Sequence, residues 1–519
     1  MLKYESDNLK LDVLAWSKYQ PCYLNRQLVT LLSTLGIKDE VFERKQSEAV
    51  AQLNAILTDP NKASEAFELM APGGENTNII KEMLLCGYKP DSEPFLSMTL
   101  QAFRALKLQD LRTKARIFIP SARSMMGCLD ETRTLEYGEV FVQYSGTNRR
   151  LSLGDAPLFA ESSNCNYIVS GYVAVAKNPC LHPGDVRVLR AVNVPALRHM
   201  VDCVVFPQKG QRPHPNECSG SDLDGDIYFV CWDQDLIPKE MKQPMDYTPA
   251  PSMELDHDVT MEEVQKYFVD YMVNDSLGRI SNAHVVFADK EAQKAMSEPC
   301  LELAKLFSVA VDFPKTGVPA KMPSHLFVKE YPDFMEKPSD QKTYVSSRVI
   351  GKLYRAVKDI SLDVITSFTR EDAVRWYDAD LEVEGFKGFI RDAVNCKTEY
   401  DFMLRNLMES YGINSEAEML CGGVIKPSKV FDHKKDPSAV HFALKALKKE
   451  ARSWFMQGSQ SREESLAKAS AWYHVTYHPT YWGWYNKGGE TDHLISFPWC
   501  VYDKIIEIKR FKTRMRNLH

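Results

Sequence analysis

Apolar residues recur at every third or fourth position over residues 24–57 and 77–108. This spacing places them along one face of an α-helix. Two breaks interrupt the pattern, at Asp59-Pro60 and at residues 71–74, which read Ala-Pro-Gly-Gly. Proline lacks a backbone donor and glycine is conformationally free, so both residues favour the ends of helices. The first hundred residues are therefore predicted to be mainly helical.

Short runs rich in β-branched and aromatic residues follow, bounded by glycine, proline and aspartate. Such runs are typical of β-strands separated by turns. The predicted strands cover residues 115–119, 139–144, 167–176, 186–194, 203–206 and 227–230.

Helical spacing returns in the second half of the chain. Residues 243–253 are rich in proline and are predicted to form a linker. The predicted helices beyond it cover residues 259–272, 291–311, 349–368 and 440–455, while residues 417–420 are left undecided.

The composition is that of a large globular protein. The 519 residues are 44% hydrophobic and 26% charged, which suggests three or four domains with an ample core. The longest apolar runs are too short to span a membrane, and the charged start MLKYESDNLK is unlike a signal peptide. We therefore expect the protein in the nucleus or the cytoplasm, with no membrane partner, and not secreted.

Cysteine spacing argues against disulfides and a zinc site, and the net charge limits how the chain could contact nucleic acid. The twelve cysteines include no C-x-x-C pair and no Cys/His spacing suited to zinc, so mostly reduced, buried thiols are expected. With a net charge of −6, any nucleic-acid contact would need local basic patches. A solvated helix face explains each candidate patch equally well. The candidates are Arg348, Lys352, Arg355 and Lys358; Lys445, Lys448, Lys449 and Arg452; and Lys504, Lys509, Arg510, Lys512, Arg514 and Arg516.

Aromatic residues gather in residues 471–499, which hold Trp472, Trp482, Trp484 and Trp499. They could form a surface on which nucleic-acid bases stack. Aromatics interleaved with glycine and proline more often form a small compact core under loops, and we favour that interpretation.

Three aspartates, Asp222, Asp224 and Asp226, stand at every second position just before the last predicted strand. In an extended chain such side chains point the same way, about 7 Å apart. Two unpaired charges near 6 Å repel by about 3 kcal/mol at an effective dielectric near 20, which a divalent cation would relieve. Oxygen-only ligation suits Mg²⁺ or Mn²⁺, ions that serve phosphoryl and nucleotidyl transfer. Gly225 permits a sharp turn and a close approach of substrate.

Two other interpretations of the acidic motif stay open. A calcium loop of the EF-hand type needs glycine at its sixth position, which is Ile227 when counted from Asp222. Its twelfth position is Asp233, but a hydrophobic strand signal occupies the stretch before it. A solvated acidic turn without any ion is the second alternative.

The acidic motif does not stand alone, because four further blocks of sequence accompany it. Together they resemble the eukaryotic RNA-dependent RNA polymerases of RNA silencing, whose signature is Asp-hydrophobic-Asp-Gly-Asp. The resemblance covers essentially the whole chain, and residues 219–238 and 255–288 are most similar to the plant type 1 branch. The blocks are residues 18–27 (KYQPCYLNRQ), 126–131 (MGCLDE), 173–192 (VAVAKNPCLHPGDVRVLRAV) and 308–317 (SVAVDFPKTG).

The resemblance implies an α+β fold built on a double-psi β-barrel, the second of two such barrels in the family, with the acidic motif on one of its loops. It implies four parts: a mainly helical region over residues 1–108 that follows the first barrel, the catalytic barrel over 109–245, a helical neck over 246–345, and a mainly helical head with the aromatic segment over 346–519.

The resemblance also implies an activity. Members copy single-stranded RNA from nucleoside triphosphates into double-stranded RNA for small-interfering-RNA gene silencing and antiviral defence. Asp222, Asp224 and Asp226 would be the catalytic residues and would hold Mg²⁺, or Mn²⁺. One ion would activate the 3′-hydroxyl of the growing strand and another would hold the triphosphate. Proteins of the silencing pathway are possible partners.

Lys177 is a secondary candidate. Residues 177–182 (KNPCLH) resemble the Asn-Arg-x-Pro-x-Leu-His block of cellular polymerases, which implies that Lys177, with Gly225, contacts nucleotide or RNA. A solvated lysine at a strand end is the alternative. His182 is a weaker candidate that could simply order the turn that follows it.

The chain is about half as long as members of this family or less, and no stretch matches their first barrel. We therefore expect that a first barrel is missing. This leaves open a non-catalytic RNA-binding fragment or interaction protein derived from such a polymerase. A nuclease or phosphatase using the same carboxylates is a third option, which the polymerase-like blocks disfavour.

Overall fold

The structure, a computed structural model, describes residues 13–72, 75–147, 164–248, 256–274, 276–364, 369–421, 437–458, 461–482 and 493–518. The chain divides into two compact units. The first comprises Met1–Lys45 with Ala115–Tyr354, and the second comprises Gln46–Lys114 with Arg355–His519. Each unit combines two segments that are distant in sequence, so the units do not correspond one to one to the four parts expected from the resemblance. The division into four parts stays a prediction.

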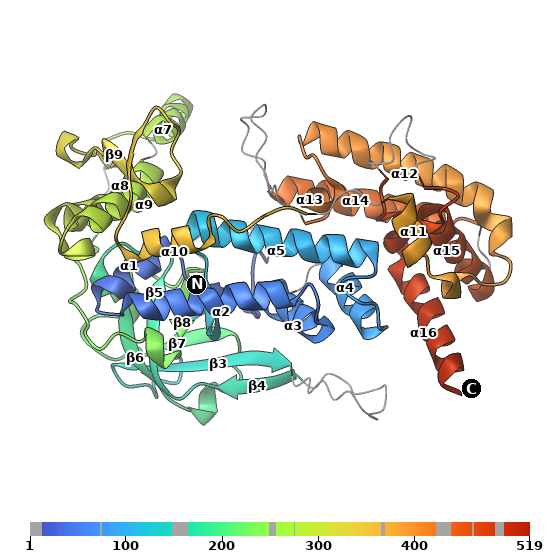
Figure 1. Cartoon of the computed structure of the whole chain (residues 1–519). Helices are drawn as coiled ribbons and strands as arrows, with labels where there is room; N and C mark the ends of the chain where they lie inside the picture. The colour runs from blue at the N-terminus through green and yellow to red at the C-terminus, as the bar shows by residue number, and fades with distance from the viewer. Residues whose placement is uncertain are drawn as a thin grey trace. The chain divides into compact units, whose positions relative to one another are not determined.

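The first unit is built on a β-barrel (Figure 1). Six strands close a ring in the order β2, β7, β3, β6, β5, β8 and back to β2, while β1 adds to β2 and β4 adds to β3. The pairs β2–β7 and β3–β6 are parallel and the other pairs of the ring are antiparallel. The strands are β1 (Pro21–Tyr23), β2 (Phe118–Leu129), β3 (Glu139–Thr147), β4 (Asn164–Ile168), β5 (Gly171–Lys177), β6 (Arg187–Ala191), β7 (Cys203–Phe206) and β8 (Ile227–Cys231).

The closed six-stranded barrel confirms the expected mixed fold of helices and strands with a β-barrel at this position. Its interior is filled by β-branched and aromatic side chains from alternate positions of the strands, as the period of two requires. The buried cluster includes Met125, Val140, Val142, Val173, Val175, Leu189, Val204, Phe206, Tyr228 and Val230.

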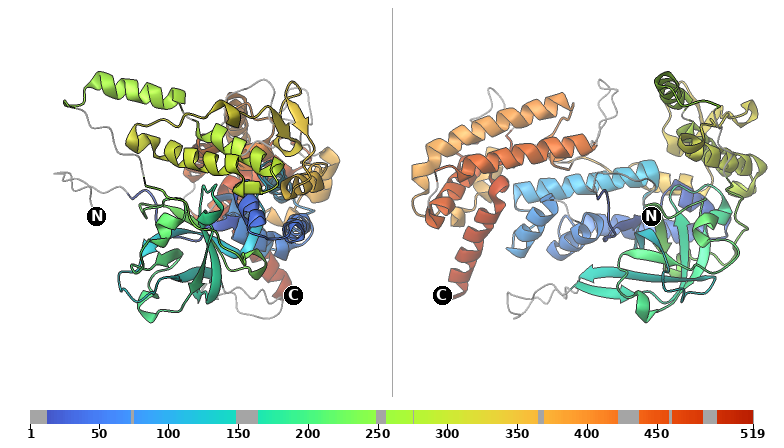
Figure 2. Two further views of the ribbon diagram at one scale, coloured as in Figure 1. Left: turned by 90° about the vertical axis from the view of Figure 1, so that its left-hand side faces the viewer. Right: turned by 180° about the vertical axis from the view of Figure 1, so that it is seen from behind.

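Helices accompany the barrel in the first unit. They are α1 (Arg26–Thr34), the first part of α2 (Asp39–Ala55), which passes into the second unit after Lys45, α6 (His214–Glu217), α7 (Met261–Asn274), α8 (Leu277–Lys290), α9 (Glu298–Thr316) and α10 (Val349–Val357), which passes into the second unit after Tyr354. In both views of Figure 2, α7 lies on the side of α8 and α9 that is away from the barrel strands. A parallel pair of short strands, β9 (Glu330–Pro332) and β10 (Lys342–Tyr344), completes the unit.

The second unit is helical in the residues that the structure describes. Its helices are α3 (Pro60–Met70), α4 (Glu75–Leu85), α5 (Pro94–Lys114), α11 (Arg370–Trp376), α12 (Ile390–Ser410), α13 (Glu416–Cys421), α14 (Pro437–Met456), α15 (Arg462–Tyr477) and α16 (Tyr502–Leu518). Trp472, Trp482 and Trp499 are all buried, which confirms the predicted compact aromatic core. Trp484 lies outside the described residues.

Several predicted elements need correction. The strand predicted at 115–119 begins only at Phe118 and continues to Leu129, because Ala115 has a positive φ of 51° and forms a turn. The single strand predicted over 167–176 is divided into β4 and β5. Helix α8 was not predicted, and the helix predicted over 349–368 ends at Val357. Residues 249–253 of the predicted linker and residues 365–368 lie outside the described residues.

Strand β8 lies in the middle of the barrel wall and leads directly out of the acidic motif. It pairs with β2 on one side, from Met126↔Ile227 to Ala122↔Cys231, and with β5 on the other, where Lys177 pairs with Tyr228. Residues 228–231 are all buried, although side chains alternate between the two faces of a strand, so both faces of β8 are covered. The start of β8 is therefore a fixed point from which the acidic loop is built.

Gly127 on β2 lies against this fixed point. Its backbone amide donates to the carbonyl of Asp226 (3.1 Å). A Cβ at this position would overlap with the ring of Tyr228 and lie 2.6 Å from Cδ2 of Leu223. A larger residue would therefore push on both ends of the acidic loop.

We predict that Gly127→Ala lowers the free energy of unfolding by about 1–3 kcal/mol, the usual cost of overpacking. The matched control is Gly278→Ala in α8, where a Cβ would meet no atom within 4 Å. That change should be neutral or should stabilise by up to about 1 kcal/mol. Thermal or denaturant unfolding of the two variants makes the comparison, and equal stability of both would contradict the packing described here.

Candidate metal and phosphate site

Asp222, Asp224 and Asp226 converge at the start of β8. Each offers a carboxylate oxygen, and these oxygens lie within 4.8 Å of one another. The loop reaches this arrangement by bending rather than by the extended chain expected from the sequence. Leu223 has a φ of 65° and Gly225 a φ of 125°. Gly225 thus supplies the expected sharp turn, and a Cβ there would meet no atom within 4 Å.

The three carboxylates differ in their surroundings. Asp222 and Asp224 are about half exposed, at 54% and 47% of their side-chain surface, whereas Asp226 is 16% exposed. Asp226 is held on both oxygens, by Lys177 Nζ at 2.8 Å from Oδ1 and by the hydroxyl of Ser221 on Oδ2. Asp226 is therefore fixed, while Asp222 and Asp224 present oxygens to the solvent.

Lys177 is the cation on the barrel side of the site. It ends β5, opposite Tyr228 of β8, and its side chain is 17% exposed. The structure thus brings Lys177 together with the acidic motif as the sequence suggested. It is a partly buried ion-pair partner of Asp226 rather than a solvated strand-end lysine.

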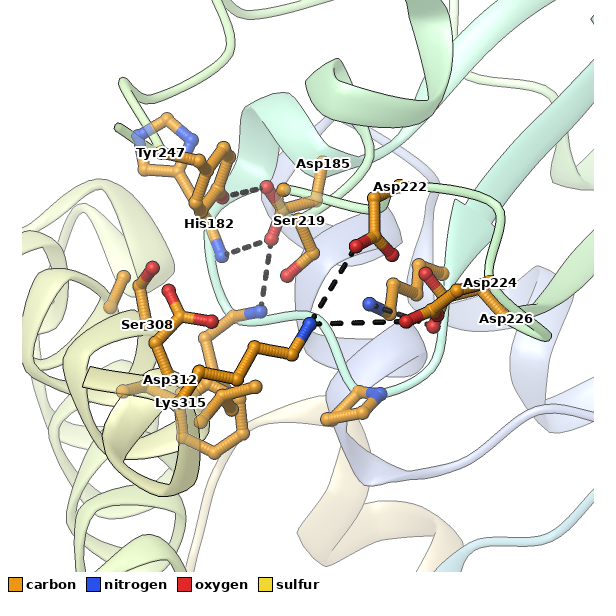
Figure 3. A pocket seen from close by; sticks show the side chains of 17 residues that line it. His182, Asp185, Ser219, Asp222, Asp224, Asp226, Tyr247, Ser308, Asp312 and Lys315 are labelled. Atoms are coloured by element: carbon orange, nitrogen blue, oxygen red, sulfur yellow. Dashed lines mark hydrogen bonds and ion pairs between the residues drawn. The ribbon is translucent and has the colours of Figure 1, made fainter. Parts of the chain in front are cut away.

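A second cation, Lys315, approaches from α9. Its Nζ lies 3.6 Å from Oδ2 of Asp222 and 3.9 Å from Oδ2 of Asp224 (Figure 3). Partial desolvation raises the pKa of Asp222, but the hydrogen bond with Asp224 and the charges of Lys315 and Lys177 outweigh it, and the net pKa is lowered. The carboxylate form that a metal ion needs is thereby favoured.

The carboxylates open onto a cavity of about 310 Å³ between the barrel and α9. Its α9 wall is one face of the helix, as the spacing of its residues by three and four shows. The lining from this wall is Ala304, Phe307, Ser308, Val311, Asp312 and Lys315. Burial raises the pKa of Asp312, which the charge of Asp222 also raises and the two lysines oppose. One end of the cavity is therefore lined by aspartates and lysines, and the wall formed by α9 is partly apolar.

The other end of the cavity is shaped by the turn at residues 182–185. Nδ1 of His182 accepts from the amide of Gly184 (3.0 Å), which confirms that His182 orders this turn. Burial, with the charge of Lys305, lowers the pKa of His182. Asp185 accepts from the amides of Leu181 (3.2 Å) and His182 (3.0 Å). The hydroxyl of Tyr247 donates to the other oxygen of Asp185.

A buried polar cluster supports the segment before the acidic loop. Glu217 on α6 accepts hydrogen bonds from the hydroxyl of Tyr137 (2.7 Å) and from Nδ1 of His214 (2.7 Å), and it forms an ion pair with Arg187 (3.1 Å). Nε2 of His214 accepts in turn from the amide of Gly138 (2.9 Å). These contacts tie the segment before the acidic loop to the residues that precede β3 and to Arg187 of β6.

Sequence reasoning missed the α9 side of the site. Residues 308–317 were noted only as a block of resemblance, although Asp312 and Lys315 stand one helical turn apart on one face. Tyr247 was missed because it lies in a proline-rich stretch that was read as a linker. Asp185, in the turn that follows His182, was not proposed as a site residue.

The basic patches expected from the sequence are partly neutralised within their own units. Lys352 pairs with Asp39 (2.8 Å) and Arg452 with Asp503 (2.9 Å). Lys509 pairs with Asp378, and Arg510 with Glu82. These four residues favour the interpretation of salt-bridged helix faces.

The donor set fits a hard divalent cation. Three carboxylates within 4.8 Å supply oxygen only, and no further cluster of three or more potential ligands occurs among the described residues. No helix of the described chain is long and apolar enough to cross a bilayer.

Comparison with known proteins identifies relatives of the whole chain. Residues 1–357 match the family described as RNA dependent RNA polymerase, and residues 376–518 match the head domain of that family. The chain is 63% identical to RNA-dependent RNA polymerase 1 of Arabidopsis thaliana, over 98% of this chain and 45% of that protein. It is 60% identical to the probable RNA-dependent RNA polymerase 1 of Oryza sativa subsp. japonica, over 100% of this chain and 68% of that protein.

A solved structure, the RNA dependent RNA polymerase QDE-1 from Thielavia terrestris, aligns with 96% of this chain and 57% of its own, at 15% identity and a TM-score of 0.49. The chain thus spans about half to two thirds of the length of the two plant relatives.

We predict a pH dependence of stability that belongs to Asp185. Burial raises its pKa from 3.8 to about 6. The folded chain therefore binds this proton more tightly than the unfolded chain. Stability falls as the pH rises from about 4 to about 6, by on the order of 3 kcal/mol, and is level above that range.

Asp185→Asn, which keeps the size of the side chain but does not titrate, is the matched variant. The stability of the wild type minus that of the variant should decrease as the pH rises from 4.5 to 6.5, as followed by thermal unfolding. A difference that stays constant across this range would show that Asp185 is ionised normally in the folded protein.

Proposed function

The chain belongs to the RNA-dependent RNA polymerase family, and on that premise we propose that it is a metal-dependent nucleotidyltransferase that copies single-stranded RNA into double-stranded RNA. One observation carries the proposal. Asp222, Asp224 and Asp226 hold their oxygens within 4.8 Å at the mouth of a cavity that also presents two lysines. A polyphosphate bound to divalent cations needs this combination of carboxylates and cations.

The proposed substrates are nucleoside triphosphates and a single-stranded RNA template. In the reaction, the 3′-hydroxyl of the growing strand attacks the α-phosphate of the nucleotide, a new phosphodiester bond forms, and pyrophosphate leaves. Double-stranded RNA for small-RNA silencing and antiviral defence is the proposed product. Nucleus or cytoplasm stays the expected compartment, with silencing-pathway proteins as expected partners.

The residues of this chain would act mainly by binding and orientation. Asp222, Asp224 and Asp226 would hold Mg²⁺, with Mn²⁺ as a substitute. When bound, such ions supply charge stabilisation to the attacking and leaving oxygens. Asp226, locked by Lys177 and Ser221, would fix the position of the set. The exposed oxygens of Asp222 and Asp224 would complete it. Little covalent chemistry by the protein is needed, because positioning and charge neutralisation supply most of the rate gain.

We predict that the purified chain incorporates labelled nucleotide on single-stranded RNA in the presence of Mg²⁺, and that Asp224→Asn lowers the rate at least about 100-fold. The variant removes one ligand charge at an exposed side chain and should keep the fold. Asp340→Asn, which removes a charge from an exposed turn outside the cavity, is the control and should retain the rate.

A second candidate function is that of a non-catalytic RNA-binding or interaction protein. It is motivated by the span of the chain, which covers 45% of the Arabidopsis relative. Mn²⁺ binding to the folded chain that is lost in Asp224→Asn, together with no incorporation, would favour this candidate. Incorporation that Asp224→Asn does not affect would remove the acidic motif from the proposed chemistry.

Lys177 and Gly225 are proposed to contact the nucleotide or the RNA. Lys177 places a positive charge beside Asp226 at the cavity wall. The absence of a side chain at Gly225 leaves the loop open to a close approach.

We predict that Lys177→Ala raises the KM for nucleoside triphosphate about tenfold, the effect of losing one charge-assisted contact. Lys177→Arg should recover part of that loss, and Lys239→Ala, at an exposed residue outside the cavity, should have none. Steady-state kinetics at saturating Mg²⁺ make the measurement. If Lys177→Ala changes metal affinity but leaves KM unchanged, then Lys177 serves only to orient Asp226.

A further inference from the structure

Lys315 is held differently from Lys177, although both lysines face the same three carboxylates. Lys177 touches Asp226 at 2.8 Å and is 17% exposed. Lys315 stands 3.6 and 3.9 Å from Asp222 and Asp224 and is 66% exposed. One lysine is therefore in a partly buried contact pair, and the other is in a loose, solvated one.

The backbone beneath Lys315 is firmly placed. Lys315 lies in the last turn of α9, where the helix dipole favours a cation, and Gly317 with a φ of 72° ends the helix. The hydroxyl of Tyr267 on α7 donates to two backbone carbonyls of this turn, those of Pro314 (2.8 Å) and Phe313 (3.2 Å). The backbone of Lys315 is therefore fixed, while its long, exposed side chain is free to change rotamer.

The position of the Lys315 ammonium conflicts with a metal ion. It faces the Oδ2 atoms of Asp222 and Asp224, and both carboxylates belong to the set that would ligate the ion (Figure 3). Two cations cannot share those oxygens at contact distance without strong repulsion. A divalent ion bound to these oxygens would therefore compete with Lys315 for Asp222 and Asp224, whereas Lys177 contacts only Oδ1 of Asp226.

The displaced ammonium would need a new anionic partner, and Asp312, three residues before it in α9, is one such group. The neighbours of Lys315 on the α9 wall are apolar except for Ser308 and Asp312. A nucleotide whose phosphates are bound to the metal would bring anionic oxygens to the mouth of the cavity, within the reach of a flexible four-carbon side chain. Lysine binds phosphate as a mobile point charge.

We propose that Lys315 exchanges partners: it neutralises Asp222 and Asp224 in the metal-free protein, and it binds the triphosphate of the incoming nucleotide once a divalent ion takes these carboxylates. This inference rests on the proposed function for the identity of the ligand. It makes Lys315 a competitor of the metal and a helper of the nucleotide. A lysine that is merely solvated would be neither.

The opposite signs of these two effects provide the test. Mn²⁺ binding to the full chain is titrated without nucleotide, by the electron paramagnetic resonance signal of free Mn²⁺. Lys315→Ala should bind Mn²⁺ about threefold more tightly than the wild type, since an exposed ion pair has been removed. Binding of α,β-methylene-ATP at saturating Mg²⁺, measured by calorimetry, should become about tenfold weaker.

Two variants serve as controls. Lys315→Arg keeps the charge on a long side chain and should restore both affinities toward those of the wild type. Lys329→Ala removes the same charge from an exposed residue that does not line the cavity, and it should change neither affinity. A helix that unfolds locally would weaken both ligands together, which differs from the predicted opposite changes.

Unchanged affinity of Lys315→Ala for either ligand would overturn the proposal, as would changes of the same sign. Neither measurement requires turnover. A chain that shows the opposite changes but incorporates no nucleotide would therefore refute the polymerase activity and support the role of Lys315. A chain that polymerises RNA while Lys315→Ala binds both ligands like the wild type would do the reverse.

Discussion

The pairing of β8 with both β2 and β5 is the constraint on which the rest of the site depends. Because β8 is bonded on both edges and buried on both faces, its first residue cannot shift without opening the barrel. Asp226 immediately precedes that residue, and its carbonyl is bonded by Gly127 of β2. Lys177 ends the strand on the other side. The rigid element thus places one carboxylate and one cation, and the remaining carboxylates follow from the loop.

Close placement of three carboxylates costs free energy, since each pair of like charges at such distances repels by a few kcal/mol at an effective dielectric near 20. The structure offsets this cost locally. Lys177 and Ser221 act on Asp226, and Lys315 acts on the other two carboxylates. In the segment before the loop, Glu217 is stabilised by hydrogen bonds from Tyr137 and His214 and by an ion pair with Arg187. The loop thus holds three carboxylates together in spite of their mutual repulsion. It is suited to bind a divalent cation in place of the looser lysine contact, that of Lys315.

Much of the barrel and the centre of the site could be predicted from the sequence, because both depend on local pattern. Strand β7 was predicted with its exact ends, and β8 to within one residue, since short β-branched runs between turn residues are unambiguous. The acidic motif was found because it directly precedes such a run, and Lys177 was found because residues 177–182 resemble a block of cellular polymerases. The roles assigned to them remain proposals.

The errors arise where distant residues decide the structure. Strand β2 extends to Leu129 through serine, arginine and glycine, with β7 and β8 as partners that local preference does not reveal. The α9 wall escaped notice for the same reason: nothing in residues 298–316 indicates that Lys315 faces aspartates some ninety positions earlier. In addition, the triad was predicted on an extended chain, whereas Leu223 adopts a positive φ that only the loop as a whole enforces.

The contrast between the two lysines has a physical consequence for how such a site could work. A cation fixed in the barrel wall stabilises the carboxylates permanently, but it cannot respond to a ligand. A cation on a helix across the cavity, exposed and loosely paired, can change partner at little cost, because a solvated pair of this kind contributes less than about 1 kcal/mol. Lys177, on a rigid strand, therefore keeps the acidic loop assembled. Lys315, at a solvated helix end, leaves Asp222 and Asp224 available to a ligand.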